Sequence, residues 1–172
     1  MSGTPDPKQL VLDYFACCDT EGMRIAFDRY LHPDVIKCDT GLGANLGLEM
    51  VQVGLDAYLE MFDRPYVHCD IKNIAASGNV VFAERVETNY NRETGDKFVG
   101  ELASVMVIEG DKIIRWSDYY DSSEYKYGRA MPRTPSIKKL MKMLGGLKEK
   151  GINIRSRLWD FADERYFGSS SQ

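Results

Sequence analysis

The feature that most constrains the fold is a series of four strand-like segments in the middle of the chain. They cover residues 66–75, 80–91, 98–108 and 112–121. Each is rich in β-branched or aromatic residues, which favour strands. The three connections between them are short, and each contains a glycine: Gly78, Gly95 and Gly110. Because short turns of this composition join antiparallel neighbours, we predict a four-stranded antiparallel meander.

Helical patterns precede these strands. Apolar residues recur at helical spacing over residues 7–19, 21–31 and 48–62. Asp6 is a suitable N-cap for the first helix, and Pro7 suits its first position. A short strand is expected at 35–40 and a glycine-containing loop at 41–47. Helices followed by a long curled sheet predict an α+β fold, in which the helices pack on one face of a strongly curved antiparallel sheet.

The chain changes character after residue 121. Residues 129–136 contain two prolines and read as a linker, and residues 137–150 read as a basic amphipathic helix. We therefore predict one domain over residues 1–128 and a helical extension over 129–172. The extension is interpreted as a lid over a pocket or as a dimer arm. The alternatives are a helix that pads the core and a basic helix that lies on an anionic membrane.

Composition narrows the function classes. The net charge is −4, which gives no basic footprint for nucleic acid. The chain has four cysteines without a CxxC pair and only two histidines, so no metal site is predicted. The cysteines are interpreted as reduced thiols of a cytoplasmic protein. The chain also lacks an apolar run long enough to span a membrane.

Two of the predicted strands carry charge at positions where core is expected. Side chains alternate between the faces of a strand, so Arg85 and Glu87 share one face. On the last strand Trp116, Asp118 and Tyr120 share a face. If the two faces coincide, an Arg⁺ lies between two carboxylates, an arrangement that suits acid–base chemistry. The alternative is a structural ion-pair network on a solvated sheet face.

Two motifs resemble a known family: Glu84-Arg85-Val86-Glu87 and Trp116-Ser117-Asp118-Tyr119-Tyr120-Asp121. Together with the order of elements over residues 8–125, they are similar to the limonene-epoxide-hydrolase branch of the NTF2-like (SnoaL-like) superfamily. The resemblance implies a cone of helices and curved sheet with the active site inside. It also implies an Arg between two acids, one activating water and the other protonating the epoxide oxygen. Arg85 matches that Arg, Glu87 replaces the first Asp, and Asp118 matches the second.

The same resemblance leaves the reaction open. The hydrolase branch holds its water with a Tyr-x-Asn segment, where this chain has Lys37 and Asp39. An ionised Asp39 only accepts hydrogen bonds, and Lys37 adds a cation. Ketosteroid isomerase and scytalone dehydratase share the cone, and the isomerase has an Asp near this point, so Asp39 is a second candidate base. Plainer interpretations make Asp39 a turn residue and Lys37 a surface lysine.

We therefore expect a cofactor-free acid–base enzyme, first an epoxide hydrolase. The alternatives are a lyase, dehydratase or isomerase, including one that cleaves a C–C bond with loss of formaldehyde, and a non-catalytic binding module. The resemblance also implies a homodimer. The substrate is expected to be a hydrophobic small molecule with one or two oxygens. The residues expected to line its pocket are Tyr58, Phe62, Met106, Trp116 and Tyr120, with Phe15, Phe27 and Leu102.

Overall fold

The structure is a computed structural model that describes residues 6–39 and 43–120. The helices are α1 (Pro7–Thr20), α2 (Met23–Tyr30) and α3 (Leu48–Phe62). The strands are β1 (Leu31–Asp39), β2 (Gly43–Leu46), β3 (Tyr66–Ser77), β4 (Val80–Tyr90), β5 (Lys97–Glu109) and β6 (Lys112–Tyr119). All three predicted helices and the four predicted strands of the meander are present. The predicted extension over 129–172, with its linker and helix, lies outside the described residues.

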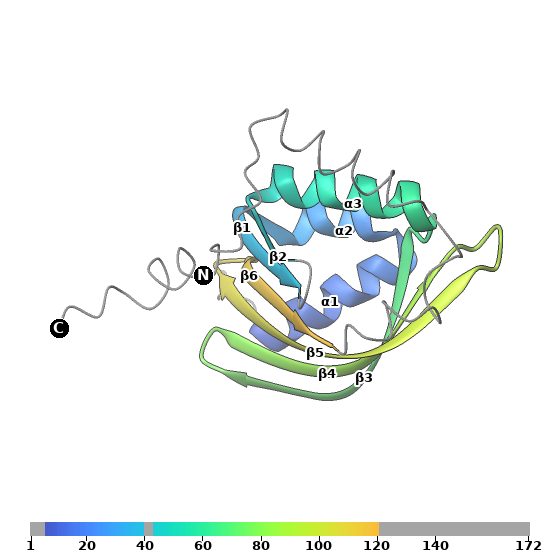
Figure 1. Cartoon of the computed structure of the whole chain (residues 1–172). Coiled ribbons are helices and arrows are strands. Elements are labelled where there is room, and N and C mark those ends of the chain that lie inside the picture. The colour runs from blue at the N-terminus through green and yellow to red at the C-terminus, as the bar shows by residue number, and fades with distance from the viewer. Residues whose placement is uncertain (1–5, 40–42, 121–172) are drawn as a thin grey trace.

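The first helix forms as its sequence predicts. The Asp6 side chain accepts a hydrogen bond from the Lys8 backbone N–H at 3.1 Å, so Asp6 is the N-cap. Pro7 occupies the first position, where its missing N–H costs nothing. The side chains at helical spacing form the buried stripe: Leu10, Val11, Tyr14, Phe15, Cys17 and Cys18. This stripe faces the concave side of the sheet, so α1 fills the interior (Figure 1).

The second helix is shorter than predicted at both ends. Gly22 has a φ of 97°, a conformation that favours glycine, and α2 therefore begins only at Met23. The Met23 N–H donates to the Pro65 carbonyl at 2.9 Å, which ties this start to the segment before β3. At the other end Leu31 is already extended and opens β1. The prediction of helix over 21–31 is corrected accordingly.

The six strands form one sheet in the order β2-β1-β6-β5-β4-β3. Strands β3 to β6 are the predicted antiparallel meander. Strand β1 pairs with β6 in parallel, so the sheet is mixed rather than wholly antiparallel as predicted. A register shift between Leu31 and Ile36 accommodates Pro33, and β1 starts earlier than the predicted residue 35.

Part of the predicted loop 41–47 is instead an edge strand. Residues Gly43–Leu46 form β2, which pairs antiparallel with β1, with Ile36 opposite Leu46. Ala44 and Leu46 pack against Ile36 and Cys38. Backbone pairing and this small apolar cluster stabilise a strand despite its glycine and asparagine, residues that are typical of turns.

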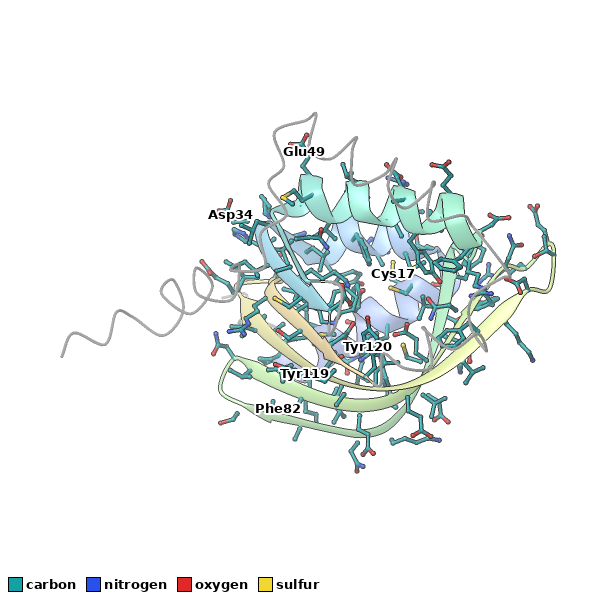
Figure 2. All side chains as sticks on the ribbon, viewed as in Figure 1. Cys17, Asp34, Glu49, Phe82, Tyr119 and Tyr120 are labelled. Carbon is teal, nitrogen blue, oxygen red and sulfur yellow. The ribbon has the colours of Figure 1, made fainter. Side chains whose placement is uncertain are left out.

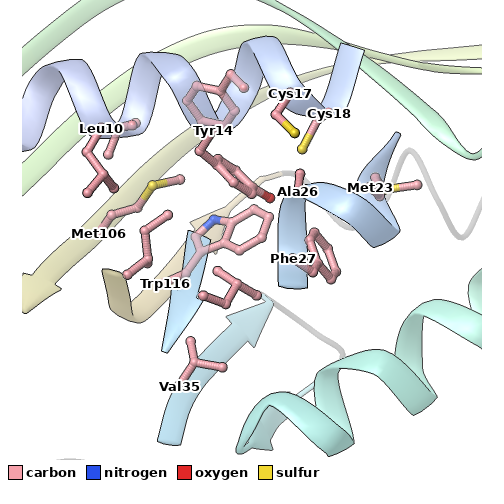
Figure 3. Packing of buried hydrophobic residues seen from close by; sticks show 14 of the residues in the cluster. Leu10, Tyr14, Cys17, Cys18, Met23, Ala26, Phe27, Val35, Met106 and Trp116 are labelled. Atoms are coloured by element: carbon pink, nitrogen blue, oxygen red, sulfur yellow. The ribbon is translucent and has the colours of Figure 1, made fainter. Parts of the chain in front are cut away.

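The core lies between the concave face of the sheet and the helices. In Figure 3 the rings of Tyr14 from α1, Phe27 from α2 and Trp116 from β6 meet. The Trp116 ring centroid is 5.3 Å from that of Tyr14 and 5.9 Å from that of Phe27, both nearly edge-on. Met106 is buried beside them. This aromatic cluster fixes α1 and α2 over β6, the strand that carries the second acidic motif.

The convex face of the sheet differs from the concave one. Phe82, Val99 and Tyr119 point outward and are 48%, 50% and 45% exposed. Figure 2 shows Phe82 on the side of the sheet away from the helices. All four cysteines are free thiols, and three of them are buried. None of the helices in the described part of the chain combines the length and apolarity that crossing a membrane requires.

Candidate functional site

The predicted carboxylate–guanidinium–carboxylate cluster is present on the concave face of the sheet. Arg85 Nη2 lies 2.9 Å from Glu87 Oε2 and 3.2 Å from Asp118 Oδ1. The Arg85 side chain is fully buried, whereas the side chains of Glu87 and Asp118 are 15% and 6% exposed. The cluster therefore does not lie on a solvated face. Its catalytic role remains a prediction.

The alternation of β4 explains why Arg85 faces inward. Val81, Ala83, Arg85 and Asn89 are buried, and Phe82 and Glu84 between them are exposed. The Arg85 guanidinium packs over the Phe15 ring of α1, 4.9 Å from its centroid. Burial opposes a charge here, but Asp118 and Glu87 raise the pKa of Arg85 and keep it cationic.

Ser104 joins the cluster from β5, between β4 and β6. Its hydroxyl accepts a hydrogen bond from Arg85 Nη1 and donates one to Asp118 Oδ1. Trp116 Nε1 donates to the same Asp118 oxygen at 2.7 Å. Three donors thus converge on one carboxylate oxygen and fix its orientation. Ser104 was not predicted as a site residue, although its hydroxyl lies in phase with the inward residues Leu102 and Met106.

A second set of hydrogen bonds holds Glu87. Asn89 Nδ2 donates to Glu87 Oε1 at 2.8 Å, and Tyr58 OH donates to Asn89 Oδ1 at 3.1 Å. Tyr58 was predicted to contact substrate, and the structure places its hydroxyl in the same network as Arg85. Burial raises the pKa of Tyr58, so the phenol stays protonated. Asn89 was missed as a site residue, although it lies in phase with Arg85 and Glu87 on β4.

Lys37 and Asp39 reach the same region from β1. The parallel register sets Lys37 beside Trp116 and Asp39 beside Asp118. Lys37 Nζ lies 2.5 Å from Asp39 Oδ2 and 4.6 Å from the centroid of the Trp116 ring. The two side chains are only 14% and 15% exposed. The interpretation of Lys37 as a surface lysine is therefore wrong.

The electrostatics of this pair follow from burial among charges. Burial raises the pKa of Asp39, Asp118 and Glu87 add to that effect, and Lys37 opposes it. For Lys37 burial disfavours the charge, but Asp39 and Asp118 together raise its pKa. Lys37 is therefore a stable cation, and Asp39 is a carboxylate that takes up a proton more readily than an exposed one.

The remaining predicted residues surround these groups. Burial raises the pKa of Tyr120, and the nearby charges of Asp39 and Asp118 add to it, as expected for a phenol on the same side as Asp118. Tyr119, in contrast, is exposed, and Figure 2 labels both tyrosines at the end of β6. Met106 is buried, and the Phe62 ring lies 5.1 Å from that of Tyr58. Asp121, the last residue of the second motif, lies outside the described residues.

Two further observations concern groups away from the cluster. The His68 side chain is 59% exposed and lies 2.8 Å from the Asp19 carboxylate, so His68 is a surface residue. Among residues 6–39 and 43–120, no three His, Cys, Asp or Glu side chains gather as a metal site would require.

Comparison with known proteins assigns this architecture. A family model for the SnoaL-like domain matches residues 11–116, which is more than half of the chain. The chain belongs to the SnoaL-like family. Its fold is NTF2-like, as the resemblance implied. The solved structures that are similar to it include an LEH-like epoxide hydrolase. No curated protein matches the sequence significantly.

Three solved structures illustrate the likeness. An LEH-like epoxide hydrolase of M. tuberculosis is 19% identical, with a TM-score of 0.57 over 84% of this chain and 96% of that protein. TerC, crystallised with polyporic acid, is 16% identical, with a TM-score of 0.57 over 70% and 96%. A protein of Pseudomonas putida KT2440 assigned as a polyketide cyclase is 18% identical, with a TM-score of 0.55 over 74% and 99%. At these identities the likeness establishes the fold alone.

Proposed function

We propose that this SnoaL-like protein is a cofactor-independent acid–base enzyme that acts on a hydrophobic small molecule, and that its reaction is epoxide hydrolysis. The observation that carries the proposal is Arg85, fully buried and within 3.2 Å of both Glu87 and Asp118. Burying a guanidinium between two carboxylates is costly for a protein and is common where protons are exchanged. A cone that only binds a ligand has little need of it.

The reaction needs one group that takes a proton and one that gives it. Water attacks an epoxide carbon, the C–O bond breaks, and the product is a diol. Of the pair Glu87 and Asp118, one takes the proton that water loses, and the other gives a proton to the oxygen that leaves carbon. Arg85 joins the two and holds the charge of the ionised one. Glutamate is one methylene longer than the aspartate of the hydrolase branch, so either the water lies at a different position on the Glu87 side or Glu87 adopts a bent rotamer.

The comparisons support this proposal at the level of the fold. One solved neighbour is named an LEH-like epoxide hydrolase, and another was crystallised with the small molecule polyporic acid. Two other similar structures are named as polyketide cyclases, so proteins of this fold are also assigned a reaction other than epoxide hydrolysis.

A second candidate function is proton transfer without addition of water, as in a lyase, dehydratase or isomerase. The largely shielded pair of Lys37 and Asp39 favours it, because an acidic carbon needs a base and its developing oxyanion needs a cation. In this reaction Asp39 removes the proton and Lys37 stabilises the oxygen. A site of this kind works best when water is kept out.

Turnover in ¹⁸O-labelled water separates the two candidates. The protein is incubated with a panel of hydrophobic epoxides and of oxygenated, enolisable compounds, and the products are analysed by mass spectrometry. One labelled oxygen in a diol supports hydrolysis. A product that gains no oxygen supports the second candidate and contradicts the first. No turnover of any compound, with ligand binding retained, favours the binding module instead.

The Glu87→Gln variant tests the assignment of the cluster. Its amide keeps the shape of the side chain but cannot exchange the proton, so turnover should fall by roughly a hundredfold or more. Glu84→Gln is the matched control, because Glu84 lies on the same strand but is exposed on the other face. Near wild-type turnover in Glu87→Gln would remove Glu87 from the mechanism.

A further inference from the structure

We infer that Lys37 and Asp39 form a subsite for a weakly acidic O–H group of the ligand, the hydroxyl of a phenol or an enol. The oxygen would bind Lys37 Nζ as its anion, and Asp39 would take the proton. This inference deepens the proposed function, since the ligand is taken to be the substrate of the same site.

The two cations of the site, Arg85 and Lys37, differ in how many of their hydrogen-bond donors are bound to described residues of the protein. Arg85 donates through Nε and Nη2 to Glu87, through Nη1 to Ser104 and through Nη2 also to Asp118. Lys37 carries three N–H donors. Within the described part of the chain its one carboxylate partner is Asp39, and it otherwise lies over the Trp116 ring. Lys37 is therefore the cation that can still donate to a ligand oxygen.

The low exposure of the interior selects a neutral acid over an ionised one. The proposed hydrolysis keeps one of Glu87 and Asp118 protonated, so the other carboxylate and Asp39 balance the cations Arg85 and Lys37. A ligand that arrives as a carboxylate would bring an unbalanced negative charge into a nearly water-free region. A phenol or enol enters uncharged and ionises only in contact with Lys37.

The proton has a defined acceptor. The ligand O–H bond breaks, an O–H bond forms on Asp39, and the ligand anion replaces the Asp39 carboxylate as the partner of Lys37. The total charge of the group is unchanged. Burial and the neighbouring carboxylates raise the pKa of Asp39, which favours this transfer.

The chain contains a matched pair on its surface. Lys72 and Asp70 lie two residues apart on β3, as Lys37 and Asp39 do on β1, and Lys72 Nζ is also 2.5 Å from its carboxylate. The surface side chains are 48% and 57% exposed, so water satisfies their remaining donors and acceptors. Lys72→Met is therefore the control for Lys37→Met.

The test uses 4-nitrophenol and 4-nitroanisole, which differ by replacement of the O–H by a methyl ether. The anion of nitrophenol absorbs in the visible range, so its formation is seen directly. Binding to the full chain is measured by calorimetry and by absorbance, at a pH where free nitrophenol is mostly neutral. We expect the wild type and Lys72→Met to bind nitrophenol about tenfold or more tightly than nitroanisole, with the anion band present.

In Lys37→Met the preference and the anion band should both disappear, while nitroanisole binding is retained. Asp39→Asn is a second variant that serves if Lys37→Met does not fold. It keeps the Lys37 cation but lacks the proton acceptor, so it should weaken the anion band. Equal binding of the two probes by the wild type would overturn the inference. So would a preference that survives in Lys37→Met. If the protein forms diols but binds nitrophenol and nitroanisole equally, only the subsite is refuted. If it prefers nitrophenol but turns over no compound, only the proposed function is refuted.

Discussion

Replacing Arg85 by methionine should destabilise the fold far more than replacing an arginine on the surface. Methionine fills much of the same volume but leaves Glu87 and Asp118 without their cation. The side chains of these carboxylates are 15% and 6% exposed, so water cannot take the place of the guanidinium. Asn89, Ser104 and Trp116 still donate to them, which limits the loss.

The magnitude follows from what breaking a buried ion pair costs. Removal of one partner typically lowers the free energy of unfolding by about 3–5 kcal/mol at neutral pH. Because a domain of this size has about 5–15 kcal/mol of stability in total, the variant should be close to the limit of folding. Arg24, which pairs with Asp56 where their side chains are 49% and 60% exposed, is the control. Arg24→Met should cost no more than about 1 kcal/mol.

Urea unfolding followed by far-UV circular dichroism measures both variants, with linear extrapolation to water. A loss below about 1 kcal/mol in Arg85→Met would refute the reasoning, because it would mean that the carboxylates do not depend on the guanidinium. Adding Glu87→Leu to Arg85→Met provides a second check. It removes one uncompensated charge, so the double variant should be more stable than the sum of the two single changes predicts, by about 0.5–3 kcal/mol.

Three further predictions concern other groups. Burial raises the pKa of Asp39 in the folded state. The free energy of unfolding of the wild type should therefore fall relative to that of Asp39→Asn as pH rises from about 4, and urea unfolding at several pH values measures this. Trp116→Phe keeps a ring but removes the N–H donor to Asp118, and should lower the free energy of unfolding by about 1–3 kcal/mol, measured in the same way. The homodimer that the resemblance implies remains a prediction; if it forms through the convex face, where Phe82 is exposed, Phe82→Glu should yield a monomer by light scattering.

The four central strands were predictable because their two faces meet different environments. Alternate residues of β4 and β5 are buried, and many of these inward positions are apolar, as at Ala83, Leu102 and Met106. Strand β2 was not predictable, because its pattern of side chains does not separate two faces. It is an edge strand held by backbone hydrogen bonds to β1, and such pairing leaves little trace in side chains.

The candidate site was predictable in part. The period of two placed Arg85 and Glu87 on one face without any knowledge of the fold. The approach of Asp118 depends on strand register, with Ser104 of β5 directly beside it, and register between distant segments is not visible in the sequence. For Lys37 the decisive fact is the parallel pairing of β1 with β6, which sets it beside Trp116. Without that pairing a lysine in a short strand looks like a surface residue.

The three carboxylates of the site, Glu87, Asp118 and Asp39, differ in the number of hydrogen bonds that they accept, and this difference indicates which one accepts a proton from a ligand. Glu87 accepts from Arg85 Nε, Arg85 Nη2 and Asn89 Nδ2, and Asp118 accepts from Ser104, Trp116 and Arg85. Among the described residues Asp39 has the single donor Lys37.

Donors of this kind stabilise the ionised form of a carboxylate, and Asp39 has the fewest of them and a pKa raised by burial. Asp39 is therefore the group that should accept a proton from a phenol or from an acidic carbon, whereas the proposed hydrolysis uses Glu87 and Asp118. Asp39→Asn should accordingly impair proton transfer without addition of water far more than it impairs diol formation. Turnover of this variant measured on both classes of compound separates the two reactions.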